Sequence, residues 1–183
     1  MQIKYLIFRI FFRNYHELLM NKTDEIFELK NNIKKLNGKI KHYDEHFKMI
    51  NELGDSGYKV IGIEKNKDDE TLIVYLGTSN YEINITGYGY RRGVKPSLYA
   101  SKVDDTLHID DIHAINEGVG NGSILMKYML RQAEKNRIKK ITGLLSYVDR
   151  DHFDILEKFY EKHGFVVNFN KNKTEGWIEQ FFS

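Results

Sequence analysis

The spacing of apolar residues divides the chain into an N-terminal helical segment and a longer part in which strands and helices alternate. From about Arg13 to Leu53 there is no proline, and over Ile26–Ile50 the apolar residues recur at intervals of three or four. This spacing is typical of one face of a helix or of a coiled-coil-like seam. The sequence Gly-Asp-Ser-Gly at 54–57 then indicates a helix end and a loop. We therefore predict a helical extension over residues 1–56 and a second domain over residues 57–183.

In the second domain, short apolar runs with alternating polar residues predict strands, and two runs with helical spacing predict helices. Three strands come first, followed by an irregular connection over 91–105 and then by a strand–loop–helix–strand–helix–strand–strand order. This order predicts an α+β (mixed α/β) fold, in which helices pack against a mixed sheet. The predicted strands cover 58–64, 71–76, 81–90, 107–115, 140–146, 165–169 and 176–182, and the predicted helices cover 123–136 and 151–163.

The predicted strand 107–115 departs from strict alternation. Ile109 and Ile112 are three residues apart instead of two, and Asp110 and Asp111 lie between them. One extra residue in a strand is what a β-bulge produces. We therefore predict a bulge at these two aspartates.

Composition and charge exclude some classes of protein. The 28 Lys and Arg against 26 Asp and Glu give a net charge of +2, which is too small to argue for nucleic acid as a partner. The absence of cysteine excludes disulfides, thiolate metal sites and a cysteine nucleophile, and we predict no metal site. Charged residues interrupt the apolar start over 1–19, unlike a membrane span, and no signal-peptide cleavage site follows it. We therefore expect a soluble, cytoplasmic protein.

A glycine-rich turn, Glu-Gly-Val-Gly-Asn-Gly-Ser at 117–123, joins a predicted strand to a predicted helix. Glycine adopts positive φ, so that backbone N–H groups at a helix N-terminus converge on an anion. A nucleotide-binding P-loop requires Lys-Ser/Thr after its last glycine, whereas Ser123 is followed by Ile124. The dinucleotide pattern G-x-G-x-x-G also fits the alternating glycines poorly. The turn therefore predicts a phosphate-binding loop of another type.

The segment 107–165 resembles the acyl-CoA core of the GNAT superfamily of N-acetyltransferases. The pyrophosphate loop of that family reads Arg/Gln-x-x-Gly-x-Gly/Ala after a bulged strand, and 117–122 matches it at both required glycines. The stretch 159–165, Phe-Tyr-Glu-Lys-His-Gly-Phe, is similar to the family's L-Y-x-x-x-G-F ending. The resemblance implies a largely antiparallel sheet, acetyl-CoA as co-substrate, and an N-acetyltransferase reaction in which an amine attacks the thioester directly.

The resemblance also implies roles for individual residues. Tyr160 stands where the family places the acid for the departing thiolate. Asp111 and His113, with Asp110 as a further candidate, lie on the bulged strand where a general base is expected, and the choice among them stays open. The main chain of His113 and Ala114 would pair with the pantetheine arm in a gap between two diverging strands. The turn would bind the pyrophosphate through Gly118, Val119, Gly120, Asn121, Gly122 and Ser123.

Two alternatives remain open. Glu117 stands where the family has Arg or Gln, which favours a second hypothesis, a catalytically silent GNAT-like module that binds a partner through the helical extension. The extension either packs on its own domain or mediates a homodimer or partner contact, because amphipathicity alone does not separate these. The amine acceptor is also open: a small molecule, a protein lysine or N-terminus, or the amine of a charged tRNA.

Overall fold

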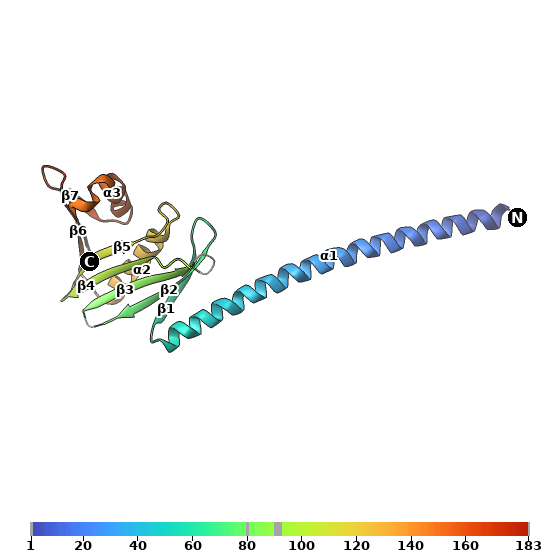
Figure 1. Ribbon diagram of the computed structural model, residues 1–183, viewed down its shortest axis with the longest axis horizontal. Helices are drawn as coiled ribbons and strands as arrows, with labels where there is room; N and C mark the ends of the chain where they lie inside the picture. Colours follow the sequence, from blue (N-terminus) through green and yellow to red (C-terminus); the bar gives the residue numbers. More distant parts are fainter. Residues whose placement is uncertain (1, 80, 90–92, 183) are drawn as a thin grey trace. The chain divides into compact units, whose positions relative to one another are not determined.

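The computed structural model describes residues 2–79, 81–89 and 93–182, and it divides the chain into two compact units, Met1–Lys48 and Met49–Ser183 (Figure 1). Helix α1 (Gln2–Asp55) begins well before Arg13, where the sequence predicts its start. Residues 2–12 contain neither glycine nor proline, so nothing in them interrupts a helix. The predicted domain boundary after residue 56 stays a prediction.

Among the described residues, no helix combines the length and the apolar run that crossing a lipid bilayer requires. The second unit is built on one sheet with the strand order β1-β2-β3-β4-β5-β6-β8-β7 (Figure 1). Within the described part of the chain, β5 and β6 pair in parallel, and the other neighbouring strands pair antiparallel. The predicted α+β class with a largely antiparallel mixed sheet is therefore confirmed. The strands are β1 (Lys59–Lys65), β2 (Thr71–Thr78), β3 (Glu82–Gly89), β4 (Ser97–Val103), β5 (Thr106–His113), β6 (Lys140–Leu145), β7 (Val166–Phe169) and β8 (Gly176–Phe181).

Helix α2 (Asn121–Lys135) connects the parallel strands β5 and β6 and packs against β3, β4 and β5. Its apolar face is fully buried, including Leu125 and Met129. Burying such side chains stabilises the fold by about 1.5–3 kcal/mol each. The short 3₁₀ helix η1 (Tyr147–His152) leads into α3 (Phe153–Lys162), which packs against β7.

Helix α3 ends within one residue of the predicted end at 163, next to a glycine. Gly164 has φ of 87°, in the left-handed region. Its N–H donates to the Glu161 carbonyl at 2.9 Å, and the Phe165 N–H donates to the Tyr160 carbonyl at 3.1 Å. These two bonds form a Schellman motif, which satisfies the last carbonyls of the helix and fixes the position of Tyr160 in the final turn.

Strand β4 contradicts the prediction of an irregular connection over 91–105, because residues 97–103 pair with both β3 and β5. Pro96 immediately precedes the strand, where its missing N–H removes no ladder bond. Its carbonyl accepts the Gly87 N–H at 2.8 Å. The proline therefore marks the beginning of a strand instead of a loop.

Strand β1 is attached to α2 through one carboxylate. The Lys127 ammonium and the Tyr128 hydroxyl both donate to Glu64 Oε1, at 2.6 and 2.9 Å. The hydrogen bond from Lys127 is the main cause that lowers the pKa of Glu64. A Cβ at Gly62 would overlap the Tyr128 ring, so only glycine allows this close approach. These contacts position the β1–β2 hairpin, whose turn reaches the candidate site.

Candidate functional site

The predicted bulge in β5 is confirmed by the register of the β4–β5 ladder. Tyr99 lies opposite Asp111 and Ala100 lies opposite Ile109, so Asp110 is the extra residue. The Ser101 hydroxyl donates to Asp110 Oδ2 at 2.6 Å. Both aspartates are exposed, and the side chain of Asp110 is held by the neighbouring strand β4.

Strands β5 and β6 separate at this bulge. Their parallel pairing runs from Thr106 opposite Lys140 to Ile109 opposite Gly143 and extends no further among the described residues. From Asp111 to His113, β5 pairs with β4 alone. One edge of β5 therefore has main-chain groups without a strand partner, as the resemblance implies for this place.

The glycine-rich turn has an unusual backbone. Ile115 and Asn116 have φ of 45° and 58°, and Gly118 and Gly120 have φ of 82° and 92°. Gly120 is the N-cap of α2 and offers no side chain for capping, and its carbonyl accepts the Ile124 N–H at 3.1 Å. The N–H groups of residues 121–123 precede that bond and have no acceptor within the helix. Such a turn at a helix N-terminus forms a concave cluster of donors that favours an anion.

The β1–β2 turn supports this loop from the side. The Lys67 N–H donates to the Val119 carbonyl at 2.9 Å. The Asn66 amide donates to Asn121 Oδ1 at 3.1 Å, and the Asn121 amide donates to the Ile115 carbonyl at 2.8 Å. Both asparagines are buried. A continuous chain of hydrogen bonds therefore connects the hairpin turn, the first residue of α2 and the end of β5.

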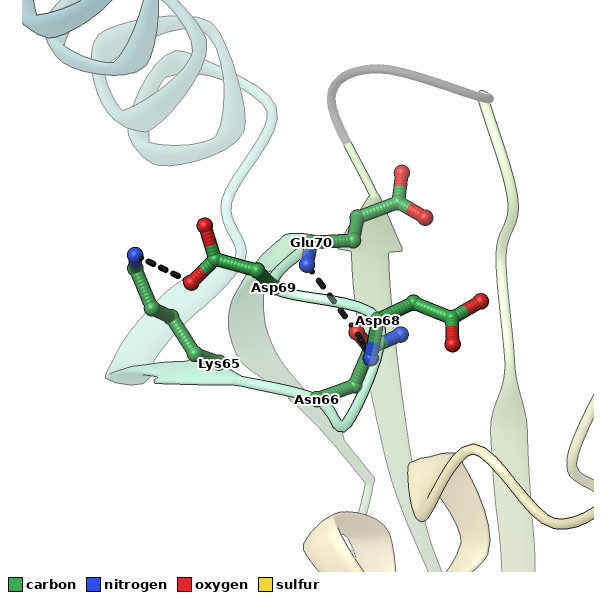
Figure 2. Close-up of polar contacts among 5 residues, drawn as sticks. All are labelled: Lys65, Asn66, Asp68, Asp69 and Glu70. Carbon is green, nitrogen blue, oxygen red and sulfur yellow. Dashed lines mark hydrogen bonds and ion pairs between the residues drawn. The ribbon is translucent and has the colours of Figure 1, made fainter.

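Within the turn, Asn66 also holds the backbone in shape. Figure 2 shows its Oδ1 accepting the N–H groups of Asp68 and Glu70, each at 3.0 Å. Lys65 and Asp69 form an ion pair at 2.6 Å across the same turn (Figure 2). One asparagine thus fixes the turn with its carbonyl oxygen and fastens it to the loop with its amide nitrogen.

The loop opens on a cleft of about 530 Å³. Seven of the predicted cofactor-binding residues line it: His113, Ala114, Gly118, Gly120, Asn121, Gly122 and Ser123. Val119, which was also predicted, is not among the lining residues, and its carbonyl is bonded to Lys67. Helix α3 forms part of the wall through Ile155, Leu156 and Phe159.

Charged residues of both signs surround the loop. Glu117 lines the cleft and is exposed. Lys67 also lines it, and its Cγ would lie 3.8 Å from a Cβ at Gly120, so its aliphatic stem runs alongside that glycine. On the other side, the Lys162 ammonium donates to the Ser123 hydroxyl at 3.4 Å. Two ammonium groups therefore oppose the single carboxylate of Glu117.

His163 lies behind Ser123 and Phe159, two residues that line the cleft. Its Nε2 lies 3.2 Å from the Ser123 Oγ, and its ring packs on Phe159 with centroids 4.9 Å apart. Burial, and secondarily the charge of Lys162, lowers the pKa of His163. The imidazole is therefore neutral at physiological pH, and Lys162 carries the positive charge here.

Tyr160, the predicted acid, lies in the core and is not among the residues that line the cleft. Its ring packs against Phe159 and Phe165, with centroids 5.2 and 5.6 Å away. Burial raises the pKa of Tyr160 well above its usual value, and the negative charges of Asp149 and Asp111 raise it further. Its hydroxyl is thus protonated and within electrostatic reach of the bulge.

The two predicted base candidates differ in their surroundings. His113 lines the cleft, whereas Asp111 does not and pairs in the ladder with Tyr99. Tyr99 lies near two other tyrosines, Tyr58 and Tyr75. The pKa of Tyr75 is raised chiefly by burial, and the nearby Tyr58 and Tyr99 raise it further. The rings of Tyr58 and Tyr75 are 5.0 Å apart. An aromatic, hydroxyl-bearing surface therefore adjoins the aspartate.

Sequence reasoning missed the contribution of the β1–β2 turn. Asn66 and Lys67 precede the loop by about fifty positions, and no local pattern connects the two segments. The one available signal was the Asn-Lys-Asp-Asp turn itself, because asparagine at this place commonly bonds to backbone N–H groups that follow it.

Comparison with solved structures identifies the fold, although no protein-family model matches the chain. The GNAT domain of S. lividans PAT aligns with a TM-score of 0.52 over 66% of this chain and 96% of that chain, at 9% identity. A Bacillus subtilis acetyltransferase in complex with CoA gives 0.48 over 61% and 99% of the two chains, at 12% identity. For the PaiA N-acetyltransferase of Thermoplasma acidophilum, in complex with coenzyme A, the score is 0.45 at 11% identity. The alignment covers 56% of this chain and 62% of that one.

A closer relative in sequence is the uncharacterized protein YocC of Bacillus subtilis (strain 168). It is 38% identical over 125 residues, which cover 66% of this chain and 75% of YocC. The chain therefore belongs to the same family as YocC and has the fold of the GNAT superfamily.

Proposed function

We propose that the protein is an acyl-CoA-dependent N-acyltransferase that transfers an acetyl group from acetyl-CoA to an amine. One observation carries the proposal: a loop with positive φ at Gly118 and Gly120 opens, at the N-terminus of α2, on a cleft beside an unpaired edge of β5. The GNAT fold adds support, since the resemblance over 107–165 implies co-substrate binding at this loop and in this strand separation.

The residues around the cleft fit such a co-substrate. The N–H groups of residues 121–123 and of the loop would hold the diphosphate, which the helix dipole favours by about 0.3–1 kcal/mol. The main chain of His113 and Ala114 would pair with the amides of the pantetheine arm. A Cβ at Gly122 would be in ordinary van der Waals contact with Phe159 and Ala114, at 3.4–3.5 Å, so the first turn of α2 lies directly against the cleft wall.

We infer that Lys67 supplies the charge that an arginine gives at the first loop position in the family. Its backbone is fixed to Val119 and its stem lies along Gly120, which keeps the ammonium near the loop. With Lys162 near Ser123, it outweighs the carboxylate of Glu117. Glu117 is therefore compatible with binding of an anionic group at this loop.

When bound, acetyl-CoA supplies a thioester whose carbonyl carbon an amine attacks directly. The protein's part is to move protons. Asp111 or His113 accepts the proton of the acceptor ammonium, directly or through water. Tyr160 lies in the core beside the cleft lining, and its raised pKa keeps its proton in place, so its hydroxyl would be the hydrogen-bond donor for the departing sulfur if the bound co-substrate reaches it. The tyrosines beside Asp111 would attract a cationic amine through their ring faces.

Calorimetry with CoA and acetyl-CoA tests the proposal. The Gly120→Ala variant strains a φ of 92° and is expected to weaken CoA binding at least tenfold. Gly57→Ala is the matched control, because its φ of 81° is equally unfavourable and its surroundings are open. No binding of CoA by the wild-type protein would contradict the proposal and favour a silent interaction module. A panel of amines, with free CoA as the readout, would then define the acceptor.

A further inference from the structure

The exposed face of α1 carries a strict heptad pattern. From Leu19 onward, seam positions recur at alternating intervals of four and three residues, and they are largely exposed, from 49% for Leu19 to 65% for Phe47. This much exposed apolar surface in one stripe of a helix is typical of an interface. In heptad notation, the a positions are Leu19, Ile26, Ile33, Ile40 and Phe47, and the d positions are Lys22, Leu29, Leu36 and Tyr43.

We propose that this stripe pairs with the same stripe of a second copy of the chain, as a parallel, in-register, two-stranded coiled coil over residues 19–47. A sustained repeat of seven residues, rather than 3.6 per turn, is what a left-handed supercoil requires. β-Branched residues at a and leucine at d favour two parallel strands. Ile26 with Leu29 and Ile33 with Leu36 follow this rule in two successive heptads.

The charges beside the seam are complementary in this arrangement. In a parallel coil, each g residue faces the e residue five positions later on the other copy. Glu25 then faces Lys30 of the second copy, and Lys39 faces its Asp44. Between these two opposite-charge pairs, Asn32 faces the neutral Asn37. No like charges therefore face each other over residues 25–44.

Two further residues agree with this register. Lys22 is the one charged residue at a seam position, and its ammonium pairs with Glu25 of its own helix at 2.6 Å, which directs it toward the g position. Gly38 falls at an f position, on the outer face, where a Cβ would meet nothing within 4 Å. Neither residue interrupts the seam.

Sedimentation equilibrium of the full chain tests the association. Twice the chain mass of 21.6 kDa is expected. The double variant Ile33→Lys/Leu36→Lys should have the mass of one chain at concentrations where the wild type has that of two. Phe27→Lys/Asn31→Lys is the matched control, with the same added charge on the same helix but at positions b and f, and it should stay dimeric. Equal behaviour of the two variants, a monomeric wild type or the mass of three chains would overturn the proposal.

Trp177, the only tryptophan of the sequence, lies in β8. Its fluorescence therefore reports the unfolding of the second unit independently of the helix. If both double variants unfold in the same transition as the wild type, their difference in mass comes from association through α1 and not from misfolding of the second unit. This readout does not involve CoA, so the association is tested whether or not the proposed activity holds.

Cross-linking tests the orientation, because the chain has no cysteine of its own. Leu29→Cys and Tyr43→Cys are about 21 Å apart along the helix. In the parallel coil, each meets its own copy and forms a disulfide on oxidation, which needs Cα atoms about 4.4–6.8 Å apart. In an antiparallel pair at most one of the two positions meets itself, so cross-linking of one variant alone, or of neither, would overturn the proposal. Phe27→Cys should not cross-link.

Discussion

Lys67 shows how a single residue outside the loop changes the charge of the cleft. We predict that Lys67→Ala weakens CoA binding about tenfold, because a charged hydrogen bond contributes about 1.5–3 kcal/mol. The control is Lys65→Ala on the same turn, since that ammonium pairs with Asp69. Calorimetry at low and moderate salt measures both variants, and the loss for Lys67→Ala should shrink as salt rises. An equal loss in the two variants would assign the effect to the turn and not to the Lys67 charge.

Tyr160 predicts a pH dependence of stability. Its pKa is raised by burial, so the folded protein holds the proton above pH 10, where the unfolded chain releases it. This stabilisation is complete below about pH 10 and is lost as the pH rises further. Tyr160→Phe removes the hydroxyl and keeps the ring contacts. The unfolding free energy, from urea titrations followed at Trp177, should therefore fall more steeply in the wild type than in the variant between about pH 9 and 11. Equal slopes would contradict a buried hydroxyl.

At this scale the sequence was informative about residues close together in the chain. The bulge at Asp110 and Asp111 could be predicted because the isoleucines on either side are three residues apart instead of two. The alternating glycines likewise indicated the loop. Lys67 could not be found this way, since its place depends on the β1–β2 hairpin reaching α2. Tyr160 is confirmed at the end of a helix, but its separation from the cleft lining depends on the surrounding core.

At the scale of the elements, the hydrogen bond between the β1–β2 turn and α2 can be tested by mutation. Asn66→Ala and Asn121→Ala each leave a buried amide without its partner, which costs about 1–3 kcal/mol. Because the two side chains bond to each other, the double variant should lose less than the sum of the single losses. Urea unfolding of the wild type and the three variants measures this coupling. Additive losses would mean that the turn and the helix are not energetically connected.

The elements that sequence reasoning placed well were those with a clear period. The helices α2 and α3 and the strands β5 and β6 follow their apolar spacing to within a few residues. Strand β4 was missed because Gly93 and Pro96 precede it and Ser97, Ala100 and Ser101 dilute its apolar pattern. Its pairing with β3 and β5 outweighs that weak local preference, which is common for β-strands.

At the scale of the whole molecule, the chain joins two units that bury their apolar residues differently. The second unit encloses one core between its sheet and helices, whereas the apolar side chains at the a and d positions of residues 19–47 of α1 are exposed in the single chain. Sequence spacing alone could not decide what covers that stripe. The heptad register and the complementary g and e charges are the features that argue for a second copy.

The parting of β5 and β6 has a consequence for selectivity. If the proposed function holds, the pantetheine arm of coenzyme A lies between β5 and β6 and pairs with β5 as an added strand would. The amides of the arm then take the place of peptide groups. These hydrogen bonds to the main chain are the same for every acyl group that coenzyme A bears. Discrimination between short and long acyl groups must therefore come from side chains beyond the separation of β5 and β6. Changing those side chains should alter which acyl-CoA is preferred and leave the affinity for free CoA intact.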